Sequence, residues 1–147
     1  MYDAILVPTD GSPAAASAID HAIELASTFD ATVHALYIVD VALYSSLEAG
    51  VDAVIEALER EGADAVETVR ERCESAGVDT ETDVLVGTVH RSIRDYVAEH
   101  DIDLVVMGTH GRKGIERFLL GSVTERTVRL SDVPVMTVRA SDSETGE

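Results

Sequence analysis

Hydrophobic and polar positions along this chain alternate between two kinds of segment. Five short apolar runs, rich in β-branched side chains and too short for an ordinary helix, predict strands at residues 2–8, 32–39, 80–86, 103–107 and 134–139. Four longer segments between them predict helices at residues 13–29, 51–76, 89–99 and from about 122 onward. Strand and helix in strict alternation with short connections predict a parallel sheet that is covered by helices on both faces.

Capping residues support these boundaries. Ser12 followed by Pro13 is an N-cap and N1 pair that favours a helix start, and Gly77 stands where glycine favours a helix end. Gly62 interrupts the long second helix and weakens its prediction slightly. A loop is expected over residues 44–50.

Helical spacing also predicts which side chains face the core. In the last two helices we expect inward positions at Ile93, Tyr96, Val97, Val123, Thr127 and Leu130. Cys73 lies on the apolar side of the second helix, where we expect a buried, inert thiol, and a single cysteine excludes an internal disulfide. The histidines at positions 21, 34, 90 and 100 share no metal-ligand spacing, so we interpret them as structural.

The length of 147 residues suits one domain, which we expect over residues 1–139. Residues 140–147 contain no apolar side chain after Ala140 and should form a disordered acidic tail. No stretch of 18 apolar residues is present, and the first residues lack the pattern of a signal peptide. We therefore expect a soluble, cytoplasmic protein.

Charge is the second feature of the composition. The formal net charge is −17, because 28 acidic residues stand against 11 basic ones, of which only Lys113 is a lysine. This balance disfavours nucleic acid and anionic membranes as partners. It is also typical of a high-salt cytosol. The screening length falls from about 10 Å at 0.1 M salt to about 3 Å at 1 M, so neighbouring acids repel each other much less at high salt. We expect a halophilic protein whose fold weakens in dilute buffer; an ordinary acidic protein is the alternative.

The basic residues gather near the C-terminus. Five of the eleven lie in residues 108–129, namely Arg112, Lys113, Arg117, Arg126 and Arg129. They either attract an anion to this segment or balance Glu116 and Glu125 as solvated charges.

A glycine pattern in the same segment points to a phosphate. Directly after the apolar strand 103–107 come Gly108-Thr109-His110-Gly111, then nine residues, then Gly121-Ser122. Glycine lets the backbone approach a ligand, and the free N–H groups of a helix start suit an anion. Structurally, Gly108 alone could end a strand, Gly121 start a helix and Ser122 cap it.

The full pattern resembles the nucleotide-binding signature of the universal stress protein A family. The likeness continues in Leu120-Gly121-Ser122-Val123-Thr124 and in Val133-Pro134-Val135, and the opening Pro8-Thr9-Asp10-Gly11-Ser12 matches the family's first strand end. It covers residues 1 to about 139. One departure is Val89, where many members carry proline two residues after the glycine that corresponds to Gly87.

The resemblance implies a doubly wound, five-stranded sheet of order 3-2-1-4-5, similar to that of adenine-nucleotide hydrolases. Strand order would reverse between strands one and four, and parallel sheets bind ligands at such a point, beyond the carboxyl ends of the strands. The family motif then implies contacts to an adenine nucleotide, ATP, with or without Mg²⁺, from Pro8, Thr9, Asp10, Val39, Gly87, Met107, Gly108, His110, Gly111, Arg112, Gly121, Ser122, Val123 and Thr124.

Other nucleotide machinery is absent from the sequence. Lys113 lacks the glycines and hydroxyl of a P-loop, and no Gly-x-Gly-x-x-Gly follows the first strand. Asp10 has no evident partner base, which argues against an efficient phosphoryl-transfer enzyme. A binding module that acts by occupancy is the first interpretation; slow hydrolysis or self-phosphorylation on Ser122 or Thr124 stays open.

A second interpretation is a nucleotide-free dimer that acts through partner proteins, since one branch of the family lacks the glycine signature. Resemblance and an apolar edge predict a homodimer through strand five, with Val135, Met136 and Val138 at the interface.

Overall fold

Nine elements alternate along the chain in a computed structural model, which describes residues 1–40, 51–109 and 121–140. They are β1 (Ala4–Pro8), α1 (Pro13–Phe29), β2 (Thr32–Asp40), α2 (Val51–Ser75), β3 (Thr80–Gly87), α3 (Val89–Glu99), β4 (Leu104–Gly108), α4 (Ser122–Leu130) and β5 (Val135–Val138). The predicted alternation is confirmed. The predicted loop at 44–50 and all of the predicted tail after Ala140 lie outside the described residues.

The strands form one parallel sheet in the order β3-β2-β1-β4-β5, which confirms the predicted fold class. β1 is central: Pro8 pairs in register with Leu36 of β2, and Leu6 with Val105 of β4. From β1 the sheet extends through β2 to β3 on one side and through β4 to β5 on the other. Strand order therefore reverses between β1 and β4.

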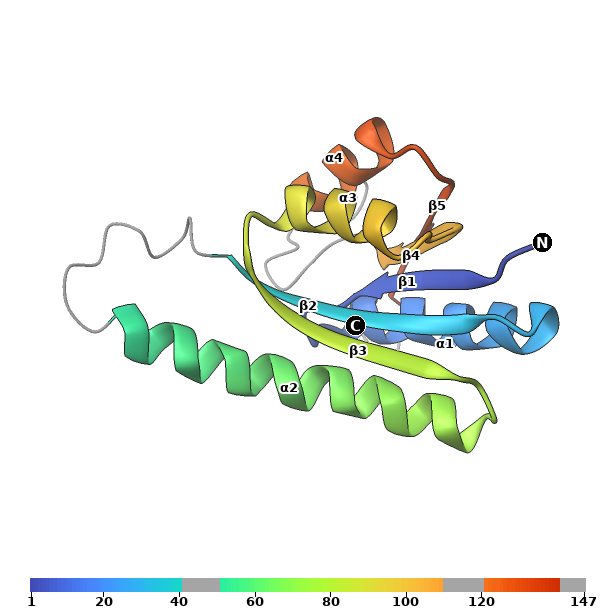
Figure 1. The fold of residues 1–147 in the computed structure, drawn as a ribbon, viewed down its shortest axis with the longest axis horizontal. Coiled ribbons are helices and arrows are strands. Elements are labelled where there is room, and N and C mark those ends of the chain that lie inside the picture. Colours follow the sequence, from blue (N-terminus) through green and yellow to red (C-terminus); the bar gives the residue numbers. More distant parts are fainter. Residues whose placement is uncertain (41–50, 110–120, 141–147) are drawn as a thin grey trace.

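This reversal also decides which face each helix covers. Figure 1 shows α1 and α2 on one face of the sheet and α3 and α4 on the other. Crossovers between parallel strands are right-handed, so reversing the direction of strand addition moves the helices to the opposite face. The result is a three-layer sandwich. None of the described helices is long and apolar enough to cross a membrane.

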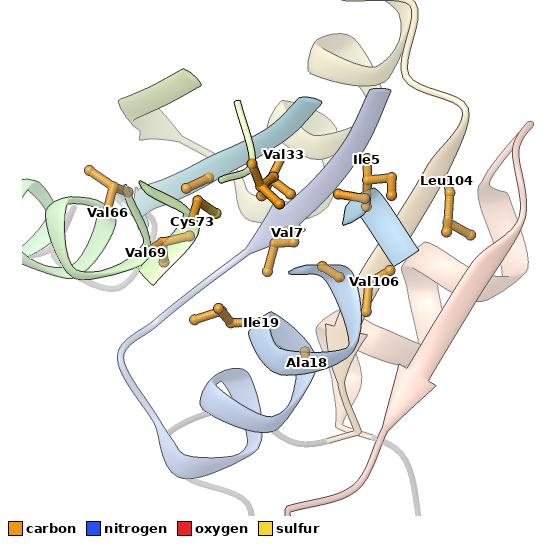
Figure 2. Packing of buried hydrophobic residues seen from close by; sticks show 14 of the residues in the cluster. Ile5, Val7, Ala18, Ile19, Val33, Val66, Val69, Cys73, Leu104 and Val106 are labelled. Carbon is orange, nitrogen blue, oxygen red and sulfur yellow. The ribbon is translucent and has the colours of Figure 1, made fainter. Parts of the chain in front are cut away.

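The larger hydrophobic core lies between the sheet and the pair α1 and α2. Ile5 and Val7 of β1 point into it with Val106 of β4, and they meet Ala18 of α1 and Val69 of α2 (Figure 2). Cys73 belongs to the same cluster and is fully buried, as the helical spacing predicted.

A smaller core lies under α3 and α4. It is formed by the alternate strand residues, such as Leu6 and Val105, together with Ile93 and Tyr96 of α3. Val123 packs against this cluster, whereas the prediction for Leu130 was wrong: its side chain is 46% exposed. Leu130 is the last residue of α4, so its side chain lies at the end of the helix.

Candidate functional site

The first part of the candidate site is the turn that joins β1 to α1. Thr9 continues the sheet beyond β1, because its N–H donates to the Leu36 carbonyl at 2.8 Å. The Asp10 carboxylate accepts from the Ser12 N–H at 2.9 Å, and Gly11 takes a φ of 80°, a left-handed conformation that suits glycine. The turn thus holds the Asp10 carboxylate at the carboxyl edge of the sheet.

Ser12 ends this turn and starts α1. Its hydroxyl accepts from the Ala15 N–H at 3.3 Å, and Pro13 follows at the first helical position, as the sequence predicted. A side-chain oxygen therefore accepts a hydrogen bond from one of the otherwise free backbone amides in the first turn of α1.

The second part is the end of β4, where Gly108 lies against α1. A Cβ atom placed on Gly108 would stand 2.8 Å from the Ala14 Cβ and 3.0 Å from the Ala14 carbonyl carbon. Glycine is needed here for helix-to-strand packing, whether or not a ligand is bound. Sequence reasoning missed Ala14 as the partner; the small side chains of Ala14-Ala15-Ala16 were the available signal.

Hydrogen bonds tie the start of α4 to the end of β4. The Gly121 N–H donates to the Thr109 carbonyl at 2.7 Å, and the Thr124 hydroxyl donates to the Gly108 carbonyl at 2.8 Å. These bonds hold the two ends of the segment 110–120 together. The predicted site residues His110, Gly111 and Arg112 fall in that segment, outside the described residues.

Hydroxyl groups at the start of α4 differ in exposure. Gly121 is the N-cap residue, so the alternative in which Ser122 caps the helix is wrong. Ser122 is exposed in the first turn, while Thr124 is only 3% exposed and its hydroxyl is engaged by Gly108. The Thr124 hydroxyl thus holds the start of α4 against the end of β4, whereas the Ser122 residue is exposed.

The third part comprises the ends of β2 and β3, where Val39 is buried and Asp40 pairs in register with Gly87. A Cβ on Gly87 would stand 2.9 Å from the Ser92 hydroxyl oxygen. The departure at Val89 has a simple structural context. Val89 is the first residue of α3, the position where proline is favoured but not required.

Two of the five clustered basic residues lie in described parts of the chain. Arg129 donates through Nε to the Glu125 carboxylate at 2.8 Å, and this hydrogen bond lowers the pKa of Glu125. Arg129 therefore balances an acid, as one of the two interpretations held. Arg126 has no such partner among the described residues.

A buried polar cluster lies away from this edge. The ring of His34 on β2 is 5% exposed, and its Nδ1 is 3.0 Å from the Tyr96 hydroxyl of α3. His100 stacks on Tyr96 with ring centroids 3.7 Å apart. Burial lowers the pKa of His34 and raises that of Tyr96. Within the described ranges no three His, Cys, Asp or Glu side chains form a metal-binding group, and His34 and His100 have structural contacts.

Known proteins are similar to this chain in both sequence and fold. The sequence model of the Universal stress protein family matches residues 1–139. The universal stress protein MJ0531 of Methanocaldococcus jannaschii is 39% identical over 146 residues, which cover 98% of this chain and 86% of that protein. The chain therefore belongs to the Universal stress protein family.

Solved structures extend the comparison to the fold. The structure of MJ0577, from the same archaeon, has a TM-score of 0.87 at 29% identity and covers 97% of this chain and 99% of its own. UspA from Lactobacillus plantarum has a TM-score of 0.81 at 32% identity, covering 94% and 98%. A universal stress protein in complex with cAMP has a TM-score of 0.68 at 28% identity, covering 95% and 98%.

Proposed function

We propose that this chain is a binding module for an adenine nucleotide, ATP, at the carboxyl edge of its sheet. The observation that carries the proposal is the convergence of two distant segments at the strand-order reversal. The turn that follows β1 and the start of α4 both stand where parallel sheets receive ligands, because β1 and β4 are neighbours. The relative in complex with cAMP supports an adenine nucleotide as the ligand class.

Each part of the site has a distinct role in this proposal. The Asp10 carboxylate accepts hydrogen bonds from the ribose hydroxyls, and Val39 offers its backbone to adenine. The amides at Gly121 and Ser122, at the positive end of α4, receive phosphate oxygens. Met107, Gly108, Val123 and Thr124 support the loop, Pro8, Thr9 and Gly87 shape its surroundings, and His110, Gly111 and Arg112 flank the phosphates.

A magnesium ion fits this site only as a companion of the phosphates. Mg²⁺ requires about six oxygen ligands and usually keeps several waters, taking one or two carboxylates from the protein. Asp10 is the carboxylate in the described turn after β1. We therefore propose that any Mg²⁺ arrives with ATP and does not bind to the empty protein.

Occupancy, not turnover, is the proposed mode of action. The Thr124 hydroxyl is buried and already donates to the Gly108 carbonyl, which disfavours it as a phosphate acceptor. Ser122 is exposed and remains the candidate for slow self-phosphorylation. Release of inorganic phosphate that disappears in Asp10→Asn but persists in Asp52→Asn, an exposed acid of α2, would support a slow ATPase instead.

The second candidate is a nucleotide-free dimer, and the packing of Gly108 favours it. Because Ala14 alone explains why residue 108 is glycine, part of the signature can persist without a ligand. β5 is an edge strand whose partner within the described sheet is β4, and Val135 and Met136 are half-buried while Val138 is buried. Pairing of two β5 strands is the interface we propose for either function. A monomeric mass by light scattering in high salt would exclude it.

The first test identifies what the protein carries. The chain is purified in multimolar KCl and denatured, released nucleotide is identified by chromatography, and ATP with Mg²⁺ is then titrated calorimetrically. We expect about one adenine nucleotide per subunit, or micromolar affinity, about −8 kcal/mol. Protein that is empty and also ignores ATP would favour the nucleotide-free dimer.

Replacing Gly121 tests where the phosphates bind. The φ of −61° at Gly121 is open to any residue, so bulk, not backbone strain, is what Gly121→Val introduces. We expect at least a tenfold loss of ATP affinity, about 1.4 kcal/mol, because a β-branched side chain obstructs the backbone amides.

Gly121→Thr is the matched variant, since threonine is also β-branched but is a good N-cap. It should bind ATP as poorly as Gly121→Val while retaining more of the stability of α4. Unchanged ATP affinity in both folded variants would place the phosphates elsewhere.

A further inference from the structure

A groove separates α3 from α4 on the outer side of the molecule. It encloses about 520 Å³, a volume within the range of small-ligand sites. Its apolar lining comes from both helices and the segments that follow them, namely Ile93, Val97, Ala98, Ile102, Leu130 and Val133. None of these residues belongs to the nucleotide site proposed above. The exposed side chain of Leu130, which helical spacing predicted to face inward, forms part of the groove.

Charges in the groove are separated along its length. His90 and Arg91 lie in the first turn of α3, whereas Arg94 and Arg126 lie at the midpoints of α3 and α4. Asp101 and Asp132 follow the ends of the two helices, and Asp95 is the remaining acid of the lining. Both helices run from the carboxyl edge of the sheet to its amino edge, so the basic residues extend from the carboxyl edge to the middle of the groove, a part that we call the basic end.

Ion pairing distinguishes the arginines at this end from other arginines that the structure describes. Arg91, Arg94 and Arg126 form no ion pair with any residue that the structure describes. Other arginines behave differently: Arg70 pairs with Glu67 and Glu74, Arg72 with Asp20, and Arg129 with Glu125.

Electrostatics favour an anion at the basic end of the groove. The chain as a whole has a net charge of −17, so three arginines that line one groove without an ion-pair partner among the described residues are a local exception to its acidic composition. Arginine also binds carboxylates and phosphates in bidentate geometry.

We propose that this groove binds an amphiphilic anion, with a carboxylate or phosphate monoester as its head group and a medium-length alkyl chain as its body. The head group contacts Arg94 and Arg126. The alkyl chain lies along Val97 and Leu130 toward Asp101, which is seven residues, about 10 Å, further along the chain from Arg94. Asp101 and Asp132 disfavour a second anionic group at the far end.

Decanoate is the first probe, at a KCl concentration where circular dichroism shows an intact fold. Titration is followed by calorimetry and by ¹H–¹⁵N NMR, and saturable binding with shifts confined to α3, α4 and the residues after them is expected. Decyl phosphate in parallel decides between the two head groups. Absence of saturable binding for both would overturn the proposal.

Charge selectivity separates a built site from detergent adsorption. Decyltrimethylammonium has the same alkyl chain and the opposite charge, and an acidic protein would adsorb it more readily than decanoate. We expect at least tenfold weaker binding of this cation in the groove. Equal or tighter binding of the cation at the same resonances would overturn the proposal.

Substitutions test which residues contact the head group and which contact the alkyl chain. Arg94→Glu should lower decanoate affinity at least tenfold, whereas Arg60→Glu, an exposed arginine of α2, should leave it unchanged. Leu130→Gln alters a half-exposed side chain, so it should fold normally and bind decanoate several-fold more weakly. Wild-type affinity in folded Arg94→Glu would show that the groove does not hold the anion.

Discussion

Gly108 connects packing to function at the scale of one residue. The missing side chain lets the end of β4 approach Ala14 of α1, and the same residue offers its carbonyl to the Thr124 hydroxyl. Three elements therefore meet at one glycine. A ligand-binding motif can in this way be maintained by packing as well as by binding.

Gly108→Ala should destabilise the fold by about 1–3 kcal/mol, because the new methyl group overlaps the Ala14 Cβ and backbone. The measurement is denaturant unfolding in high KCl. Ala14→Gly in the same chain should restore part of the loss, since it removes the Cβ contact at 2.8 Å but leaves the backbone contact at 3.0 Å. Gly108→Ala with wild-type stability would show that α1 and β4 separate easily.

His34 makes stability depend on pH. Burial holds its pKa below the ordinary value of 6.5, with the nearby charge of His100 acting in the same direction and Glu81 and Asp83 opposing it. Between the lowered folded pKa and 6.5 the unfolded chain therefore binds more protons at this position than the folded chain does. Stability should rise with pH across that window and be lost as the pH falls.

The measurement compares the free energy of unfolding of wild type and His34→Gln from pH 7.5 to pH 5.5 at constant KCl. His34→Gln should flatten the pH dependence. His21→Gln, which changes an exposed histidine, should retain the wild-type slope. Identical slopes for wild type and His34→Gln would mean that His34 does not titrate differently in the folded state.

At the scale of elements, tertiary contacts explain exceptions in the sequence pattern. Gly62 weakened the helix prediction for 51–76, yet α2 runs through it. A Cβ at this position would overlap the Tyr37 ring of β2, so the packing requires glycine. The aromatic ring occupies the space that a side chain would need. Helix propensity alone would disfavour this glycine, and packing across 25 residues of sequence explains it.

The start of α3 tolerates a proline. The N–H of Val89 is in the first turn of the helix, and Thr88 has φ −83° and ψ 126°, a conformation compatible with a following proline. Val89→Pro should keep the free energy of unfolding within about 1 kcal/mol of wild type. Ile93→Pro, inside the same helix, should cost about 3 kcal/mol or more. Equal losses, measured by denaturant unfolding, would contradict the observed start of α3.

For the whole molecule, charge density is the main determinant of how stability responds to solvent. Few ion pairs among the described residues offset the net charge of −17, and the pairs within α2 and within α4 are exposed. Exposed pairs contribute little, so repulsion among the acids remains largely uncompensated in dilute buffer. A salt-rich cytoplasm is the environment that we propose for this chain.

Raising KCl from 0.1 M to 2 M at pH 7.5 should therefore raise the thermal midpoint by about 5 °C or more, about 1.5 kcal/mol or above for a domain of this size. Scanning calorimetry measures it. Near the sequence pI of about 4.4 the net charge is close to zero, and the same KCl series should have a smaller effect. A midpoint that stays constant or falls at pH 7.5 would contradict a halophilic character.

The sequence by itself determined the class of fold, because the spacing of apolar residues reports which face of each element is buried. It also identified the turn at Thr9–Ser12 and the glycines at 108 and 121, since turn and cap chemistry is local. Tertiary structure alone decided that Ala14 requires Gly108, that Thr124 is buried, and that Leu130 is exposed in the groove between α3 and α4. Those contacts depend on register and crossing between distant segments, and the periodicity of one segment contains no information about its partner.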